Sequence, residues 1–140
     1  MSISPEDIGA KVRELGLADR VHVRGFSEEP TQLMNSADVF LMCSRREAFG
    51  RVTVEAMKLG KPVVGARSGG TPEIVKEGET GYLYSPGDPR ELADRIRDLY
   101  ADSSAREAMG AKGRQRADER FTLERYGAEV EDILRRVACA

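Results

Sequence analysis

The chain has 140 residues, a length that suits one domain with a core of its own. A third of the residues are charged, yet the formal net charge is only −2, which excludes the basic surface of a dedicated nucleic-acid-binding protein. No apolar run approaches the roughly 20 residues of a membrane span, and the first residues are too polar for a signal peptide. These features favour a cytoplasmic protein and leave peripheral contact with a membrane surface open.

The cysteines and the histidine do not show the spacing of a metal site or of a disulfide framework. The two cysteines, Cys43 and Cys139, form neither a disulfide framework nor a metal motif. The single histidine, His22, lies in a predicted strand, where a surface histidine is the default. We therefore expect reduced thiols and no metal site.

The first quarter of the chain predicts two helices and a strand. Ser4 is a suitable N-cap for a helix that starts with proline and two acids, and Gly16 is a suitable stop. The alternating segment that follows predicts a strand at 21–24. Residues 30–35 predict a short helix.

Short apolar strands alternate with helices in the middle of the chain. Strands are predicted at 38–43, 62–66 and 82–84. A helix that begins near Gly50 connects the first two, and a single helical turn at 73–76 connects the last two.

Three helices are predicted to close the chain. Asp88 is the expected N-cap of the first, which runs to about Leu99 and has proline at its first position. A heavily charged helix is predicted from about 105 to 120. The last, at 123–137, carries apolar residues at helical spacing.

The alternation of strands and helices predicts an α/β fold. We expect a Rossmann-like parallel sheet of about four strands, with helices on both faces and a helical C-terminal segment. We treat residues 1–140 as a single domain with an α/β part at 1–100 and C-terminal helices at 101–140.

The stretch from Ser44 to Met57 is the strongest candidate for a functional site. It follows a predicted strand and leads into a helix, and parallel sheets bind ligands at the carboxyl ends of their strands, where helix N-termini present N–H groups to anions. Glu47 in the loop and Glu55 in the helix lie eight positions apart. This arrangement favours a phosphorylated, hydroxyl-rich ligand.

Four charged residues of this stretch have an ordinary alternative. Glu47 could be an exposed loop glutamate, and charge statistics alone favour that reading. Glu55 could be a solvated helix glutamate paired with Lys58. Arg45 and Arg46 could offset phosphate charge, although loop arginines are usually solvated.

Several ordered motifs resemble one known family. In chain order they are Glu47-x7-Glu55 with Ala56-Met57-x-x-Gly60-x-Pro62-Val63-Val64, Gly69-Gly70-x-Pro72-Glu73, Gly78-x-Thr80-Gly81 and Pro86-Gly87-Asp88. Together they resemble the C-terminal domain of retaining glycosyltransferases of the GT-B type, family 4. The resemblance runs from about Val21 to Leu99.

The resemblance implies that the chain is part of a two-domain enzyme. In that family the C-terminal domain holds the nucleotide-sugar donor, and the N-terminal domain supplies most of the acceptor site. The family's C-terminal domain opens with two further strands, which carry a Gly-Arg signature and a lysine, and neither precedes Met1. We therefore expect a truncated donor-binding domain for a UDP- or GDP-linked sugar, inactive in transfer without the missing acceptor domain.

By resemblance, the two missing strands would lie between the strand at 21–24 and that at 38–43. Their absence would leave backbone groups without partners. We expect either self-association through exposed sheet edges or poor anchoring of the first ~25 residues. Direct pairing of the two strands in a well-packed monomer would contradict this expectation.

The resemblance also implies roles for single residues. Glu47 lies beside the transferred sugar and is the catalytic candidate, because a carboxylate favours the positive charge of an oxocarbenium-like transition state. Ala48, Phe49 and Gly50 present backbone N–H groups to the sugar and distal phosphate. Glu55 binds the ribose hydroxyls.

Further residues have weaker support. Gly25 and Phe26 stand where the family's chain passes the nucleobase, but a simple buried phenylalanine explains Phe26 equally well. The loop at 69–71 is more structural than catalytic. The family generally needs no metal, so we expect no cofactor besides the donor substrate.

Two functions of other classes remain open. One is a non-catalytic module that binds a nucleotide or a sugar phosphate. The other is a helix-rich assembly module that keeps the motifs only as a scaffold.

Overall fold

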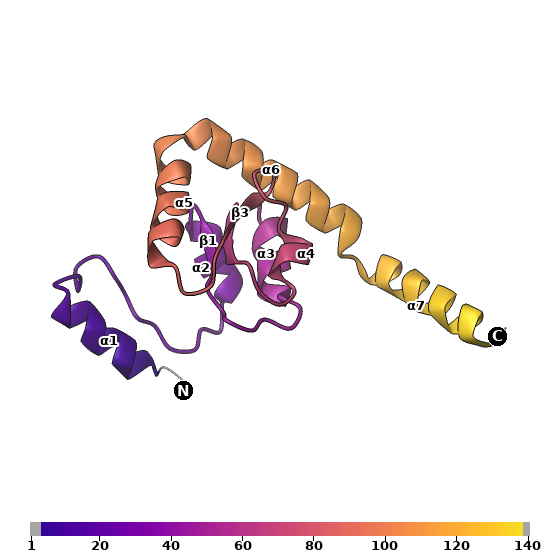
Figure 1. Ribbon diagram of the computed structural model, residues 1–140, viewed down its shortest axis with the longest axis horizontal. Coiled ribbons are helices and arrows are strands. Elements are labelled where there is room, and N and C mark those ends of the chain that lie inside the picture. The colour runs from indigo at the N-terminus through magenta and orange to yellow at the C-terminus, as the bar shows by residue number, and fades with distance from the viewer. Residues whose placement is uncertain (1–3, 139–140) are drawn as a thin grey trace. The chain divides into compact units, whose positions relative to one another are not determined.

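The structure is a computed structural model that describes residues 4–138, so Cys139 lies outside it. The chain divides into two compact units, with the boundary after Pro30 (Figure 1). Within residues 4–138, every helix is too short or too polar to span a lipid bilayer.

The described part of the first unit, from residue 4 onward, contains one helix, α1 (Pro5–Glu14). A capping box starts it: the Asp7 N–H donates to Ser4 Oγ at 3.2 Å, and the Ser4 N–H donates to Asp7 Oδ2 at 2.9 Å. The bonds from Ser4 lower the pKa of Asp7. The predicted helix start at Ser4 is therefore confirmed.

The prediction of a strand at 21–24 is wrong. These residues form no regular structure, and the N–H of Val21 donates to Leu17 O at 2.9 Å in a local turn. A strand requires a neighbour for its backbone N–H and C=O groups, and none in the described residues pairs with this segment. Alternating side chains alone therefore did not produce a strand.

The second unit is built on a parallel sheet of three strands, β1 (Phe40–Met42), β2 (Val63–Ala66) and β3 (Gly81–Tyr84). They lie in the order β1-β2-β3, with Leu41 paired to Val64 and Val64 paired to Tyr82. The α/β class and the parallel sheet are confirmed. The described sheet has three strands instead of the expected four, because the segment at 21–24 does not join it.

Six helices accompany the sheet in the described residues. They are α2 (Pro30–Ser36), α3 (Arg51–Lys58), α4 (Thr71–Ile74), α5 (Pro89–Ala101), α6 (Ser103–Arg120) and α7 (Leu123–Ala138). The short α4 begins two residues before the predicted turn at 73–76, because Pro72 occupies its first turn.

Helices cover both faces of the sheet, as predicted, and Figure 1 shows the strands between α5 and α3. One face packs against α3, α4 and the end of α6, through the buried residues Met42, Val54, Met57, Val63, Ile74, Leu83 and Ala117. The other face packs against α5 and the start of α6, through Val64, Ala66, Tyr84, Leu99 and Met109. The core therefore lies on both sides of β2, which is buried at all four positions.

The start of α5 is capped as its sequence predicts. Asp88 Oδ1 accepts the N–H groups of Arg90 and Glu91, both at 3.0 Å. Glu91 in turn accepts the N–H of Ser85 at 2.6 Å, and this bond lowers the pKa of Glu91. These contacts fix the turn that leads from β3 into α5.

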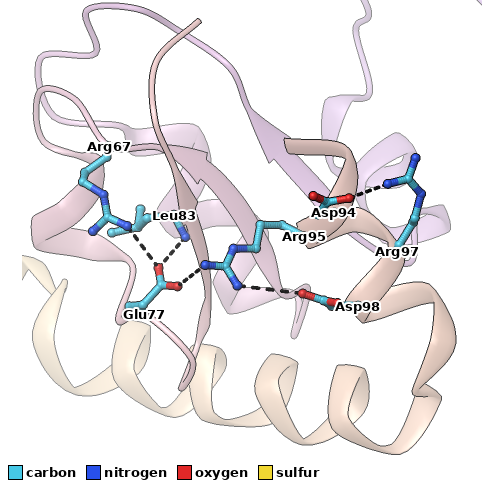
Figure 2. Close-up of polar contacts among 7 residues, drawn as sticks. All are labelled: Arg67, Glu77, Leu83, Asp94, Arg95, Arg97 and Asp98. Atoms are coloured by element: carbon cyan, nitrogen blue, oxygen red, sulfur yellow. Dashed lines mark hydrogen bonds and ion pairs between the residues drawn. The ribbon is translucent and has the colours of Figure 1, made fainter. Parts of the chain in front are cut away.

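A charged cluster covers the outer edge of β3 (Figure 2). Glu77 Oε2 accepts the N–H of Leu83 at 2.6 Å, which satisfies a donor that no strand in the described residues pairs. Arg95 lies 3.4 Å from the same carboxylate and Arg67 lies 3.9 Å from it. The Arg95 guanidinium also stands over the Tyr82 ring, 5.0 Å from its centre.

Candidate functional site

The loop from β1 to α3 lies at the carboxyl end of the sheet, where the sequence predicts a site. Gly50 is the N-cap of α3 and has φ 93°, a left-handed conformation that suits glycine. No side chain caps the N–H groups of the first turn of α3. This turn therefore offers donors and a positive potential to an anion.

A second loop holds the first one in shape. The Gly70 N–H donates to Glu47 O at 3.0 Å, and the Ser68 hydroxyl donates to Arg45 O at 2.7 Å. A Cβ on Gly69 would lie only 1.9 Å from Glu47 O, so the two backbones are in direct contact. The loop at 69–71 thus supports the site through packing, which is the structural role expected for it.

The predicted donor-binding residues occupy this supported loop. Glu47 is half-buried, Ala48 and Phe49 are exposed, and Gly50 is buried. The Glu47 carboxylate has no hydrogen-bond or ion-pair partner within residues 4–138, so it is available to a ligand.

Glu55 is exposed on the second turn of α3. The alternative of an ion pair with Lys58 is not formed in the described structure. Both side chains instead line a groove of about 480 Å³ between α3 and the junction of α6 with α7, together with Phe49.

The far wall of this groove was not predicted. It consists of Arg120, Phe121, Thr122, Leu123, Tyr126 and Glu129, which lie 65 or more positions after Glu55 in the chain. No local motif marks these residues, and only the packing of α6 against α3 brings them to Glu55. The one available signal was the break between the last two helices near Thr122.

Arg116 holds the far wall beside the site. Its Nε donates to Ile74 O at 2.9 Å and its Nη2 donates to Glu73 O at 2.8 Å, so it caps the end of α4. Burial lowers its pKa. The same guanidinium stands 5.7 Å from the centre of the Phe121 ring, which meets Phe49 edge-on at 6.2 Å between centroids.

A smaller cavity of about 300 Å³ lies at the same end of the sheet, on its α5 face. Cys43 and Tyr84 line it, with the turn that precedes α5. Burial, with a hydrogen bond to Cys43, raises the pKa of Tyr84 to about 12. The Tyr84 hydroxyl is therefore neutral at physiological pH.

Gly25 and Phe26 belong to the first unit, whereas Glu47 and Glu55 belong to the second. Gly25 and Phe26 are both exposed, and the exposed fraction of Phe26 is 96%. The alternative of a buried phenylalanine is therefore wrong.

The described residues contain no group of three or more His, Cys, Asp or Glu side chains placed to hold a metal ion. The second unit offers instead two free carboxylates and an uncapped helix turn at one sheet end. Carboxylates accept hydrogen bonds from hydroxyl groups, and the helix turn donates to anions. This set of groups can bind a ligand that carries both hydroxyls and phosphate.

Curated proteins include many relatives of this chain. It is 36% identical over 122 residues to the N-acetyl-alpha-D-glucosaminyl L-malate synthase of Bacillus anthracis, covering 87% of this chain and 32% of that protein. It is 41% identical over 95 residues to the sulfoquinovosyl transferase SQD2 of Arabidopsis thaliana, covering 66% of this chain and 19% of that protein. The chain spans a third or less of the length of these two relatives.

Solved structures share the fold. The Anabaena protein Alr3699/HepE in complex with UDP-glucose superposes with a TM-score of 0.85 at 35% identity, covering 92% of this chain and 36% of that one. The sucrose-phosphate synthase of Thermosynechococcus elongatus superposes with a TM-score of 0.84 at 32% identity, covering 96% of this chain and 34% of that one.

A sequence profile of one family matches residues 5–116, most of the chain and all of the candidate site except its far wall. The chain therefore belongs to the family of glycosyl transferases group 1.

Proposed function

We propose that this chain is the donor-binding part of a retaining glycosyltransferase of family 4. The observation that carries the proposal is the order along the chain of Glu47, the uncapped first turn of α3 and Glu55. A nucleotide-diphospho-sugar has a hydroxyl-bearing ring on each side of its diphosphate. Glu47 and Glu55 can accept hydrogen bonds from the hydroxyls of these two rings, and the N–H groups of the turn between them can donate to the diphosphate. The UDP-glucose bound to the Anabaena relative is a ligand of this class.

Each residue has a part in this proposal. Glu47 accepts hydrogen bonds from the transferred sugar and stabilises positive charge at its anomeric carbon. Backbone N–H groups of Ala48, Phe49 and Gly50 bind the sugar and the distal phosphate. Glu55 binds the ribose hydroxyls within its groove. The donor is a UDP- or GDP-linked sugar, and binding it needs no metal or further cofactor.

Transfer in this proposal also needs an acceptor-binding half, such as the part of the longer relatives that this chain does not span. The outer edge of β1, which no strand in the described residues pairs, is where we propose that further strands would join the sheet. The chain alone should therefore transfer no sugar. Sugar transfer from a radiolabelled donor by the isolated chain would contradict this.

Calorimetry tests the donor assignment. Titration with UDP, GDP and UDP-glucose should give saturable binding of at least one ligand at or below millimolar concentration. Glu55→Ala should lower the affinity for the nucleotide and for the nucleotide-sugar alike, by about tenfold or more, because a hydrogen bond to a charged group is lost. Glu47→Ala should leave the affinity for the nucleotide unchanged and lower only the affinity for the nucleotide-sugar.

The control is Glu107→Ala, which removes an exposed glutamate of α6 that lines neither the groove nor the smaller cavity. Its affinities should equal those of the unchanged protein. Unaltered nucleotide affinity in Glu55→Ala would remove the ribose assignment. No saturable binding at millimolar ligand would favour the assembly module instead.

A further inference from the structure

Arg116 of α6 is half-buried and binds the last two residues of α4. Its Nε donates to Ile74 O at 2.9 Å, and its Nη2 donates to Glu73 O at 2.8 Å. A helix of four residues has few hydrogen bonds of its own, so its position depends on contacts from outside. The planar fork of the guanidinium supplies such a contact at the C-terminal end of α4.

The short helix α4 in turn contacts both ends of the segment 47–50. Gly70, the N-cap of α4, donates its N–H to Glu47 O at 3.0 Å. The buried side chain of Ile74 lies beside Gly50, where an added Cβ would be 3.1 Å from Ile74 Cδ1. Because protein interiors are close-packed, a displacement of α4 would move both ends of this segment.

A second route joins Arg116 to the middle of the same segment. The guanidinium stands 5.7 Å from the centre of the Phe121 ring, and that ring meets Phe49 edge-on at 6.2 Å between centroids. Phe49 is 52% exposed, so much of its surface is free of protein contacts. The contact with Phe121 therefore matters for where Phe49 and its backbone lie.

We propose that Arg116 is a positioning residue for the segment 47–50, through which it supports recognition of the sugar. This inference rests on the proposed function, in which the segment binds the sugar and the distal phosphate of the donor. Arg116 does not line the groove beside Glu55, and its Nε and Nη2 both donate to α4. It acts through α4 and Phe121 and does not touch the ligand.

A long-range positive charge would have a different effect from positioning. Such a charge would attract UDP and UDP-glucose alike, because both carry the diphosphate. Positioning of the segment 47–50 instead favours mainly the ligand that carries the sugar. Arg116→Lys separates the two roles, since lysine keeps the charge but replaces the planar fork with a single nitrogen.

Calorimetry with UDP and with UDP-glucose tests the inference. In Arg116→Lys the affinity for UDP-glucose should fall by about tenfold, while the affinity for UDP should change by less than about threefold. In Arg116→Met, which keeps an unbranched side chain and loses both donors, the affinity for UDP-glucose should fall further. The ratio of the two affinities is the readout, because a loss of stability alone does not change it.

Arg106→Met is the matched control. Arg106 lies on the same helix, is also half-buried, and donates from Nη1 to Leu99 O at 2.9 Å, in the last turn of α5. Leu99 belongs to the core on the other face of the sheet. This variant should therefore lose stability and keep the ratio of UDP-glucose affinity to UDP affinity of the unchanged protein.

A measurement without ligand separates this inference from the proposed function. Hydrogen exchange of the Gly70 N–H reports its bond to Glu47 O. This exchange should be about tenfold faster in Arg116→Lys and unchanged in Arg106→Met. If the unchanged protein bound neither UDP nor UDP-glucose, the proposed function would fail, and the exchange at Gly70 would still decide whether Arg116 positions the loop.

Three results would overturn the inference. An equal fall in affinity for UDP and UDP-glucose in Arg116→Lys would mean that Arg116 acts through its charge. An unchanged affinity for UDP-glucose in that variant would limit Arg116 to a structural role. Unchanged exchange at Gly70 would show that the loop keeps its shape without the contact between Arg116 and α4.

Discussion

At the scale of single residues, glycines determine how closely the two site loops approach. Gly70 has an ordinary φ of −75°, so it is not required by backbone conformation. A Cβ there would lie 2.7 Å from Phe49 O and 2.8 Å from Ala48 O. Glycine is therefore required at this position for steric reasons. A side chain would collide with the backbone of Ala48 and Phe49, which belongs to the proposed donor site.

Gly70→Ala should lower the free energy of unfolding by about 1–3 kcal/mol, because the loops must separate to admit the methyl group. Urea denaturation followed by circular dichroism measures this. The control is Gly127→Ala, whose added methyl group meets no atom within 4 Å and should not lower the free energy of unfolding. Equal stability of Gly70→Ala and the unchanged protein would contradict the close contact of the loops.

Tyr84 predicts a pH dependence at the alkaline side. Its pKa rises from the ordinary 10.0 to about 12 in the folded state, mainly through burial. A raised pKa means that the contribution to stability is complete below pH 10 and is lost as pH rises through the folded pKa. Tyr84→Phe should therefore lose less stability than the unchanged protein between pH 9 and pH 12, by about 2 kcal/mol. Identical stability profiles would contradict the burial of the ionisable hydroxyl.

At the scale of elements, the edge of β3 depends on a side chain from outside the sheet. Glu77→Ala would leave the N–H of Leu83 without its acceptor and remove a partner from Arg95 and Arg67. We expect a loss of about 1–2 kcal/mol in the free energy of unfolding, and a smaller loss for Glu77→Gln, which keeps an acceptor.

Asp94→Ala is the matched control for this cluster. It removes the exposed pair of Asp94 with Arg97 within α5, drawn beside the cluster in Figure 2. Such a pair contributes about 0.3–0.5 kcal/mol, so the loss should be clearly smaller than in Glu77→Ala. Hydrogen exchange of the Leu83 N–H, which should accelerate only in Glu77→Ala, reports the edge directly.

The helix starts could be predicted from the sequence, whereas the pairing of strands could not. Helix starts at Ser4 and Asp88 were predictable because each cap is a local hydrogen bond within three residues. The strand at 21–24 was not, because alternation describes the side chains of a segment and says nothing of a neighbour for its backbone. Strand pairing depends on contacts between distant residues, which no local pattern contains.

At the scale of the whole molecule, the ordered motifs predicted the family and the fold class. They also placed Glu47 in a loop after a strand and Glu55 in the following helix, and the structure has Glu47 between β1 and α3 and Glu55 within α3. They could not reveal the wall formed by Phe121 and Tyr126, since only the packing of α6 on α3 brings it to Glu55. The groove is thus a tertiary feature, and its residues carry no motif.

In the proposed function, the loop from β1 to α3 binds the sugar and diphosphate of a donor, and Glu55 binds the ribose. Titration of the ¹⁵N-labelled chain with UDP and with UDP-glucose, followed by two-dimensional NMR, tests this most directly. UDP should shift the amide signals at 50–55, and UDP-glucose should add shifts at 47–49. Unshifted signals at residues 47–55 with both ligands would rule out this binding mode, as would shifts that cluster around Cys43 and Tyr84 instead.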